Sequence, residues 1–177
     1  MLKTPIVGNK IILRELKEED AEFFAYWYNK PNVMFQCGFN EPTSVEAECS
    51  RICRPEESDE EWFAITDLNG TLIGETGFLR MWRHWLCTDM SMIIPDSTTQ
   101  GLGFGLEAGQ LMLNRAFSHH NMNRVAVGVV GLNTRAISYW KRLGFKQEGL
   151  QEQGYFYDGV FSDFVMMRAL KNELYLL

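Results

Sequence analysis

The 177-residue chain contains no uninterrupted run of about 18 apolar residues, so the sequence predicts no membrane-spanning helix. The segment Met1–Lys10 lacks the apolar stretch of a secretory signal, and we expect a cytoplasmic protein. Its four cysteines do not have the spacing of a zinc site, so reduced thiols and no metal are expected. With 17 Lys and Arg against 23 Asp and Glu, the net charge of −6 argues against a nucleic-acid partner.

Acidic residues are also absent between Ala108 and Gln147. That segment contains Arg115, Arg124, Arg135, Lys141, Arg142 and Lys146, which leaves 11 cations and 23 acids elsewhere in the chain. One part of the surface is therefore expected to favour an anionic ligand and the rest a cationic one. Ordinary variation of surface charge is the alternative interpretation.

The chain has no internal repeat and no Gly/Ser-rich linker, so we expect one domain over residues 1–177. Hydrophobic periodicity and turn residues predict strands at 10–14, 62–66, 71–79, 86–94 and 125–130, with two more around Asp158-Gly159. Helices are expected from residue 18 to Pro31, from a capping box at Thr43–Glu46 to about Arg54, and over 106–118 and 134–143. This order predicts an α/β fold with a mixed sheet.

A glycine-rich loop, Gln100–Gly105, lies between a predicted strand and a predicted helix. Glycines let a backbone approach a ligand closely, and the free N–H groups of a helix start bind anions such as a pyrophosphate. A turn without a ligand is the alternative. A P-loop is excluded because no Gly-Lys-Ser/Thr follows, and the G-x-G-x-x-A match at Gly103–Ala108 lacks the acid that a dinucleotide fold needs about 20 residues later.

Two blocks of the sequence stand out, Gln100-x-x-Gly103-x-Gly105 and Asn133–Phe145. The first is similar to the acetyl-CoA motif of the GNAT superfamily of N-acetyltransferases, and the second resembles that superfamily's N-x-R-A-I-x-x-Y-x-K-x-G-F helix. Asn123–Val125 and Tyr155–Gly159 are similar to the RimJ/RimL-like branch, which includes bacterial polyamine acetyltransferases. The resemblance implies a mixed, mostly antiparallel sheet, flanked by helices, in which a central parallel pair of strands, 90–94 and 125–130, splays apart.

The resemblance also implies acetyl-CoA as co-substrate, entering the gap between the splayed strands. The residues that would then bind it are Met92, Ile93 and Ile94 along the pantetheine arm; Gln100, Gly101, Leu102, Gly103, Phe104, Gly105 and Leu106 around the pyrophosphate; and Asn133, Ala136 and Trp140. A backbone N–H of the first group would stabilise the oxyanion that develops in the transition state. The Arg or Lys partner of the 3′-phosphate is left unassigned.

One position departs from the family pattern. Trp140 stands where the family usually has a tyrosine that protonates the leaving thiolate, and an indole N–H is not a useful proton donor near neutral pH. Trp140 either packs on the cofactor while water or another group gives the proton, or the helix register lets Tyr139 or Ser138 serve. A non-catalytic acyl-CoA-binding regulatory module is the third alternative.

The attacking amine also needs a general base, because amines are protonated at neutral pH. Asp89 begins the splayed strand at a position where some family members carry an acid, and Glu75 on the preceding strand is the second candidate. For each of these carboxylates, an ordinary surface charge is the alternative.

Aromatic residues are candidates for an acceptor pocket, since indole rings make cation–π contacts with amines. Trp82, His84 and Trp85 join two strands near the expected acceptor side, and Trp27 lies on the helix that often borders the acceptor groove in the family. A core or a dimer seam is the alternative. We therefore expect an acetyl-CoA-dependent N-acetyltransferase that acts in a ternary complex on a primary amine: a ribosomal-protein N-terminus, a polyamine or another small cationic amine. Because dimers are common in the family, a homodimer is one expected state.

Overall fold

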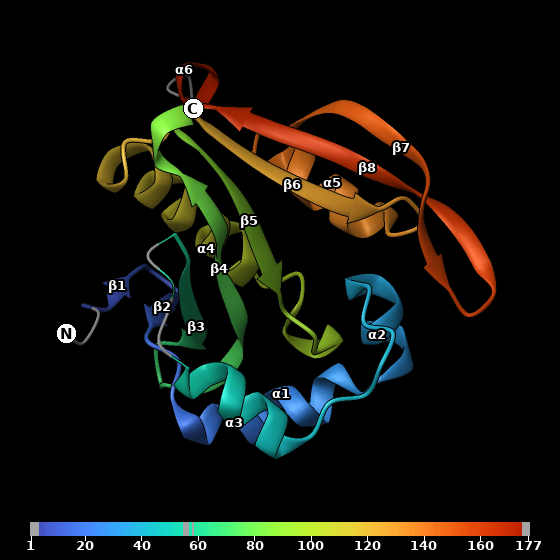
Figure 1. Cartoon of the computed structure of the whole chain (residues 1–177). Coiled ribbons are helices and arrows are strands. Elements are labelled where there is room, and N and C mark those ends of the chain that lie inside the picture. Colours follow the sequence, from blue (N-terminus) through green and yellow to red (C-terminus); the bar gives the residue numbers. More distant parts are fainter. Residues whose placement is uncertain (1–3, 55–56, 58, 175–177) are drawn as a thin grey trace.

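The computed structural model describes residues 4–54, 57 and 59–174 (Figure 1). Both ends of the expected domain, 1–3 and 175–177, lie outside the described residues, as do 55, 56 and 58. Within the described chain one sheet has the order β1-β2-β3-β4-β5-β6-β8-β7. Its strands are β1 (Ile6–Val7), β2 (Ile11–Arg14), β3 (Glu61–Asp67), β4 (Leu72–Trp82), β5 (Cys87–Ile93), β6 (Arg124–Val130), β7 (Lys146–Tyr157) and β8 (Val160–Leu170). Of the pairings described, β5–β6 alone is parallel, so the predicted mixed, mostly antiparallel sheet is confirmed.

Helices cover both faces of this sheet. They are α1 (Ala21–Tyr28), α2 (Pro31–Cys37), α3 (Val45–Cys53), α4 (Phe104–Asn114), which runs into a π-helical turn at Arg115–His119, α5 (Thr134–Arg142) and α6 (Lys171–Leu174). The larger core lies between the sheet and α4 and α5, and a smaller core joins α1 and α2 to the other face. In the described part of the chain, no helix is both long enough and apolar enough to cross a membrane.

The first helical region differs from the prediction. Pro31 does not end a helix that starts at residue 18; α1 ends at Tyr28, and Pro31 is the first residue of α2. A helix tolerates proline there because the first N–H groups have no intrahelical partner. The predicted capping box does not form: the N-cap is Ser44 rather than Thr43, and its hydroxyl accepts a hydrogen bond from the N–H of Ala47, which has no side-chain acceptor to return.

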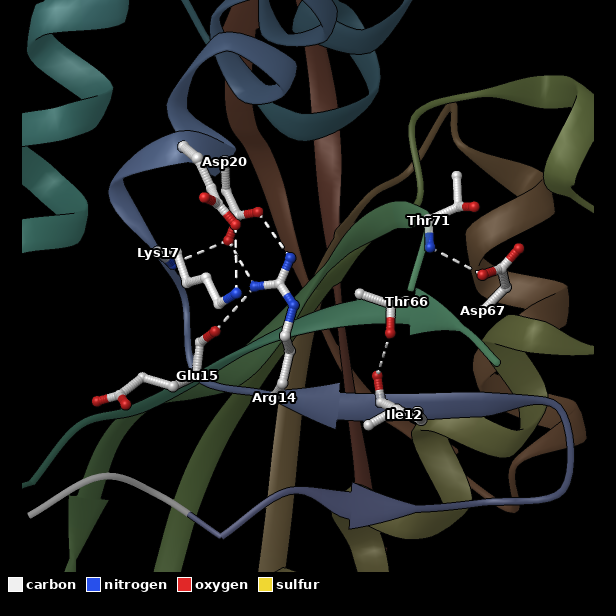
Figure 2. A network of polar contacts seen from close by, with 9 residues as sticks. Ile12, Arg14, Glu15, Lys17, Asp20, Thr66, Asp67 and Thr71 are labelled. Atoms are coloured by element: carbon white, nitrogen blue, oxygen red, sulfur yellow. Dashed lines mark hydrogen bonds and ion pairs between the residues drawn. The ribbon is translucent and has the colours of Figure 1, made fainter. Parts of the chain in front are cut away.

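An ion pair fixes the start of α1 against the sheet. Figure 2 shows Arg14, at the end of β2, donating to both carboxylate oxygens of Asp20, each at 2.7 Å. Asp20 is buried and also accepts from the N–H of Lys17 at 2.8 Å. Behind this pair, the Thr66 hydroxyl of β3 donates to the carbonyl of Ile12. Helix α1 is therefore anchored to the sheet at its first turn.

The parallel pair β5–β6 opens as predicted. The two strands pair at Cys87–Arg124, Thr88–Val125 and Asp89–Ala126, and then run apart (Figure 1). Side chains alternate along β5, so Met90 and Met92 join the core beneath α4. Asp89, Ser91 and Ile93 face the opposite side, where Ile93 packs against the cluster of α1 and α2. Side chains from both faces of the sheet therefore border the gap between the two strands.

Candidate active site

A cleft of about 670 Å³ opens where β5 and β6 separate. Its lining includes residues 89–95 of β5 and the turn after it, 127–130 of β6, Thr99, Gln100, Gly101, Gly103, Gly105 and Leu106 of the glycine loop and α4, Asn133, Arg135, Ala136, Ser138, Tyr139, Trp140 and Arg142 of α5, Val33, Gln36 and Cys37 of α2, Leu79 of β4, and Phe164 and Met166 of β8. All residues predicted to bind the cofactor are in this set except Leu102, which is exposed, and Phe104, which packs on the core.

The glycine loop is shaped by left-handed backbone at Gly101 (φ 83°) and Gly103 (φ 91°), a conformation that favours glycine. Gly103 is the N-cap of α4, so the first N–H groups of that helix have no partner within it. The Gln100 side-chain amide donates to the carbonyl of Ile94 at 2.7 Å. This contact holds the loop against the end of β5, where the cleft begins.

The first β-hairpin, formed by β1 and β2, contacts the glycine loop and α4 from outside the cleft. Glu107 of α4 accepts hydrogen bonds from the N–H groups of Asn9, Lys10 and Ile11, at 2.6, 2.8 and 3.2 Å. The Lys10 ammonium donates to the carbonyl of Leu102 at 2.9 Å. No motif points to Lys10 or Glu107; the turn residues Gly8-Asn9 are the available sequence signal.

Tyr139 and Trp140 are neighbours with different surroundings. The Tyr139 hydroxyl lies 2.8 Å from the carbonyl oxygen of Gly105 and 3.0 Å from the Met92 sulfur, and burial raises the pKa of this phenol. Trp140 is 4% exposed and packs edge-on against Tyr139 and Phe145, with ring centroids 4.9 Å apart in each case. The Tyr139 hydroxyl is thus held by the α4 side of the cleft, while Trp140 forms part of its wall.

Asn133 connects the cofactor side of the cleft to α2. Its side-chain oxygen caps α5 by accepting from the N–H of Ala136 at 3.0 Å, and its amide nitrogen donates to the carbonyl of Gln36 at 3.4 Å. The Tyr155 hydroxyl of β7 donates to the carbonyl of Phe35 at 2.8 Å. These contacts hold α2 across one end of the cleft.

Three of the six cations between residues 108 and 147 are neutralised by acids elsewhere, in the ion pairs Arg115–Glu61, Arg124–Glu148 and Lys146–Glu173. The other three, Arg135, Lys141 and Arg142, are exposed on α5 and have no ion-pair partner among the described residues. Arg135 and Arg142 line the cleft, whereas Lys141 does not. The positive charge left over for a ligand is therefore concentrated on one helix.

Asp89 lies at the point where the two central strands part and lines the cleft. Burial raises the pKa of its carboxyl group, and the positive charges of Arg80 and Arg124 partly oppose that shift. A half-buried carboxylate with a raised pKa is a stronger base than an exposed one, which suits proton removal from an ammonium group.

Glu75 has a different environment. It is 3% exposed and does not line the cleft. Its two oxygens are occupied by the Tyr28 hydroxyl at 2.6 Å and the Arg51 guanidinium at 3.0 Å. Burial raises the pKa of Glu75, against the opposing charge of Arg51. The geometry makes Glu75 part of the buried contact between α1, α3 and β4.

The predicted aromatic acceptor wall lies away from the cleft. Trp82, His84 and Trp85 line a separate hollow of about 430 Å³. Because β4 and β5 are antiparallel, their connection sits at the end of β5 that pairs with β6, opposite the open end. Trp27 packs on the smaller core and also does not line the cleft.

A mixed sheet that opens at one parallel pair and places a glycine-rich helix start beside the gap is the architecture expected of an acetyl-CoA-dependent transferase. Residues 10–146 match the model of the acetyltransferase (GNAT) domain, and the chain belongs to this family of acetyltransferases, which use acetyl-CoA. Nothing in the comparisons supports the non-catalytic regulatory module.

Similar proteins have related names. The chain is 24% identical to the spermidine N(1)-acetyltransferase of Vibrio cholerae, over 94% of this chain and 96% of that protein. It is 28% identical to the probable N-acetyltransferase YjcK of Bacillus subtilis, over 94% and 97%. Among solved structures, spermidine N-acetyltransferase from Vibrio cholerae in complex with CoA and spermine has a TM-score of 0.84 at 23% identity, over 95% of this chain and 99% of that one. RimL, a ribosomal L7/L12 alpha-N-protein acetyltransferase, has a TM-score of 0.82 at 17% identity, over 96% and 95%. These structural likenesses show the fold.

Proposed function

We propose that the chain is an N-acetyltransferase that passes the acetyl group directly from bound acetyl-CoA to a primary amine. The observation that carries this proposal is the gathering of the predicted cofactor residues around the one opening between β5 and β6. The residues present suit that ligand. The loop at Gly101 and Gly103 leaves room for close approach to the backbone, and Arg135 and Arg142 of α5 line the same cleft.

Acetyl-CoA, when bound, supplies a thioester that an amine can attack. The N–H groups at the start of α4 would hold its pyrophosphate, and the Asn133 side chain its pantetheine arm. A backbone N–H among Met92, Ile93 and Ile94 would donate to the thioester oxygen, where negative charge develops in the transition state. Residues of β5 after Asp89 suit this role, because β6 no longer pairs with them.

Asp89 is proposed as the general base, acting directly or through one water. Trp140 would pack against the bound cofactor while water protonates the departing thiolate. Tyr139 is proposed as a positioning residue, because its hydroxyl is engaged with Gly105 and its pKa is raised by burial. Glu75 is proposed to hold α1 and α3 against β4 by binding Tyr28 and Arg51.

The acceptor belongs to the class of small or terminal primary amines: a polyamine, another small cationic amine or a ribosomal-protein N-terminus. The names of the relatives support this range, as does the motif similarity to the RimJ/RimL-like branch. A single domain over residues 1–177, a cytoplasmic location, a homodimer, and the absence of a nucleic-acid partner and of a metal stay predictions.

The test is release of free CoA thiol from acetyl-CoA in the presence of a panel of amines and peptides, with Asp89→Asn as the matched variant. We expect amine-dependent release by the wild type and a large loss in the variant. Acetyl-CoA binding without amine-dependent release for any member of the panel would contradict the proposal.

A further inference from the structure

On the face of the sheet opposite α4, the cleft has an apolar part, which we take as the acceptor side. It is lined by Val33 of α2, Leu79 of β4, Ile93 of β5, and Phe164 and Met166 of β8. Phe164 and Met166 pair with Val130 and Gly128 of β6, so they face the same side of the sheet as these residues. An alkyl or aryl group in this half of the cleft would be removed from water.

Negative charge is scarce in the same space. Among the described residues that line the cleft, Asp89 is the one carboxylate. Arg80 and Arg124 act on it from the two flanking strands, and Arg124 is itself paired with Glu148. An ammonium group that enters the cleft therefore meets a single carboxylate, and the positive charges of Arg80 and Arg124 already partly balance the charge of that carboxylate.

Glu75 of the neighbouring strand β4 does not add to that charge. Tyr28 and Arg51 occupy its oxygens, and Arg51 also binds Glu48 at 2.8 Å. A ligand would have to displace one of these buried partners to reach Glu75, which leaves a buried polar group unpaired.

A polyamine has at least one further ammonium group. That group would lie against the apolar lining of the cleft, where it would have no carboxylate partner. Burial of an unpaired charge is strongly unfavourable, whereas a methylene chain or a ring gains from the same surroundings. An apolar channel also favours the neutral form of the reacting amine, which is the nucleophile.

We propose that the acceptor of this enzyme is a monoamine on an apolar carbon frame, with no second cationic group near the first. This inference rests on the proposed acetyl transfer to an amine and narrows its substrate class. It sets the chain apart from the relatives that are named for spermidine, although the fold is shared.

The first test is the binding of hexylamine and of 1,6-diaminohexane to the CoA-saturated protein, measured by calorimetry at one fixed pH. The two ligands have the same carbon chain and differ by one amino group. We expect hexylamine to bind at least about tenfold more tightly. Equal or tighter binding of the diamine or of spermidine, or no binding of hexylamine, would overturn the inference.

Turnover of the same amines separates the two proposals. Preferential binding of hexylamine without any acetylated product would refute the transfer reaction and leave the binding preference standing. Acetylation with the diamine or spermidine as the better substrate would support the transfer reaction and refute the preference.

A gain-of-charge variant tests the cause of the preference. Leu79 lines the cleft and is 47% exposed, so Leu79→Glu adds a carboxylate at the rim without disturbing the core. We expect about a five- to tenfold shift of the kcat/KM ratio and of the binding ratio toward 1,6-diaminohexane. The matched Leu79→Gln variant, which has similar shape and no charge, should leave both ratios unchanged. An equal response of the two variants would overturn the charge argument.

Discussion

The hydroxyl of Tyr139 lies 2.8 Å from the carbonyl oxygen of Gly105, and this contact joins α5 to the first turn of α4. The residue next to it, Trp140, lines the same cleft and packs edge-on against Tyr139 and Phe145. The two adjacent aromatic residues therefore make different contacts, and we propose that Tyr139 holds the shape of the glycine loop while Trp140 packs on the bound cofactor.

Removal of the Tyr139 hydroxyl should affect cofactor binding more than chemistry. A single neutral hydrogen bond contributes about 1 kcal/mol, so Tyr139→Phe is expected to raise KM for acetyl-CoA about two- to fivefold with little change in kcat. Steady-state kinetics at saturating amine measures both constants. A drop in kcat of a hundredfold at unchanged KM would instead make Tyr139 the proton donor.

Trp140 allows a comparison of two variants that differ by one hydroxyl group. Trp140→Tyr should exceed Trp140→Phe in kcat by about tenfold or more, because only the tyrosine variant can protonate the thiolate. The pH profile of kcat for the tyrosine variant should also gain a limb at high pH, which the phenylalanine variant lacks. Equal rates for the two variants would show that no proton donor is needed at this position.

Asp89→Asn should lower kcat/KM about 10²–10³-fold, the usual loss when a general base is removed. In the wild type, activity should fall as Asp89 is protonated at low pH. Because burial raises the pKa of Asp89, that limb should lie above the ordinary aspartate value of about 4. The limb should be absent in Asp89→Asn and present in Glu75→Gln; the reverse result would assign the base to Glu75.

The two arginines of α5 that line the cleft should carry the affinity for the phosphates of CoA. Arg135→Gln and Arg142→Gln should each raise the Kd for CoA about five- to twentyfold and weaken its salt dependence. Lys141→Gln is the control, since Lys141 lies on the same helix outside the cleft lining. A loss seen with CoA and not with dephospho-CoA assigns the contact to the 3′-phosphate, and no loss with either ligand would contradict the prediction.

Stability should depend on pH through Glu61, which is buried beside Arg115 and His120. Burial raises the pKa of this acid, but its two partners outweigh burial and lower the pKa to about 2, from an ordinary value near 4.5. The ionised form therefore stabilises the fold above about pH 4.5, and this stability is lost as pH falls toward about 2.

The corresponding loss in the free energy of unfolding is about 3 kcal/mol. Urea titrations between about pH 6 and 2 should show it in the wild type and in the control Glu152→Gln, whose carboxyl group is exposed. Glu61→Gln should be less stable at neutral pH and should lack this part of the pH dependence. A parallel pH dependence in Glu61→Gln and wild type would contradict the assignment.

Local sequence patterns predict most of the strands of the mixed sheet and the glycine-rich loop before α4. The apolar run Val125–Val130 and the glycines Gly101 and Gly103 determine the local backbone conformation directly. A short segment of sequence is therefore sufficient to predict a strand and a turn there. Pro31 is misleading because proline is unfavourable inside a helix and favourable at its first turn, and the sequence around it allows both outcomes.

Side-chain partners distant in sequence are what local patterns leave out. Because Arg115 is paired with Glu61, this cation is not available to a ligand, and the pairing requires the π-helical turn Arg115–His119 to lie against the start of β3. Likewise, the sequence predicts Glu75 as a candidate base, because the contacts from Tyr28 of α1 and Arg51 of α3 to its carboxylate are visible only in the folded structure. The sequence does not predict the apolar lining that we propose as the acceptor side, because its residues come from α2, β4, β5 and β8, which no single motif spans.

The hydrogen bonds from the first hairpin to Glu107 and Leu102 also link two distant parts of the chain thermodynamically. A ligand that stabilises the loop before α4 must stabilise the hairpin by the same free energy of coupling, because linkage is reciprocal. Amide hydrogen exchange at Lys10 and Ile11, whose N–H groups bond Glu107, should therefore slow when the cleft is occupied. Hydrogen exchange in the hairpin β1–β2, at one edge of the sheet, would therefore report on ligand binding in the cleft without an acceptor amine and without turnover.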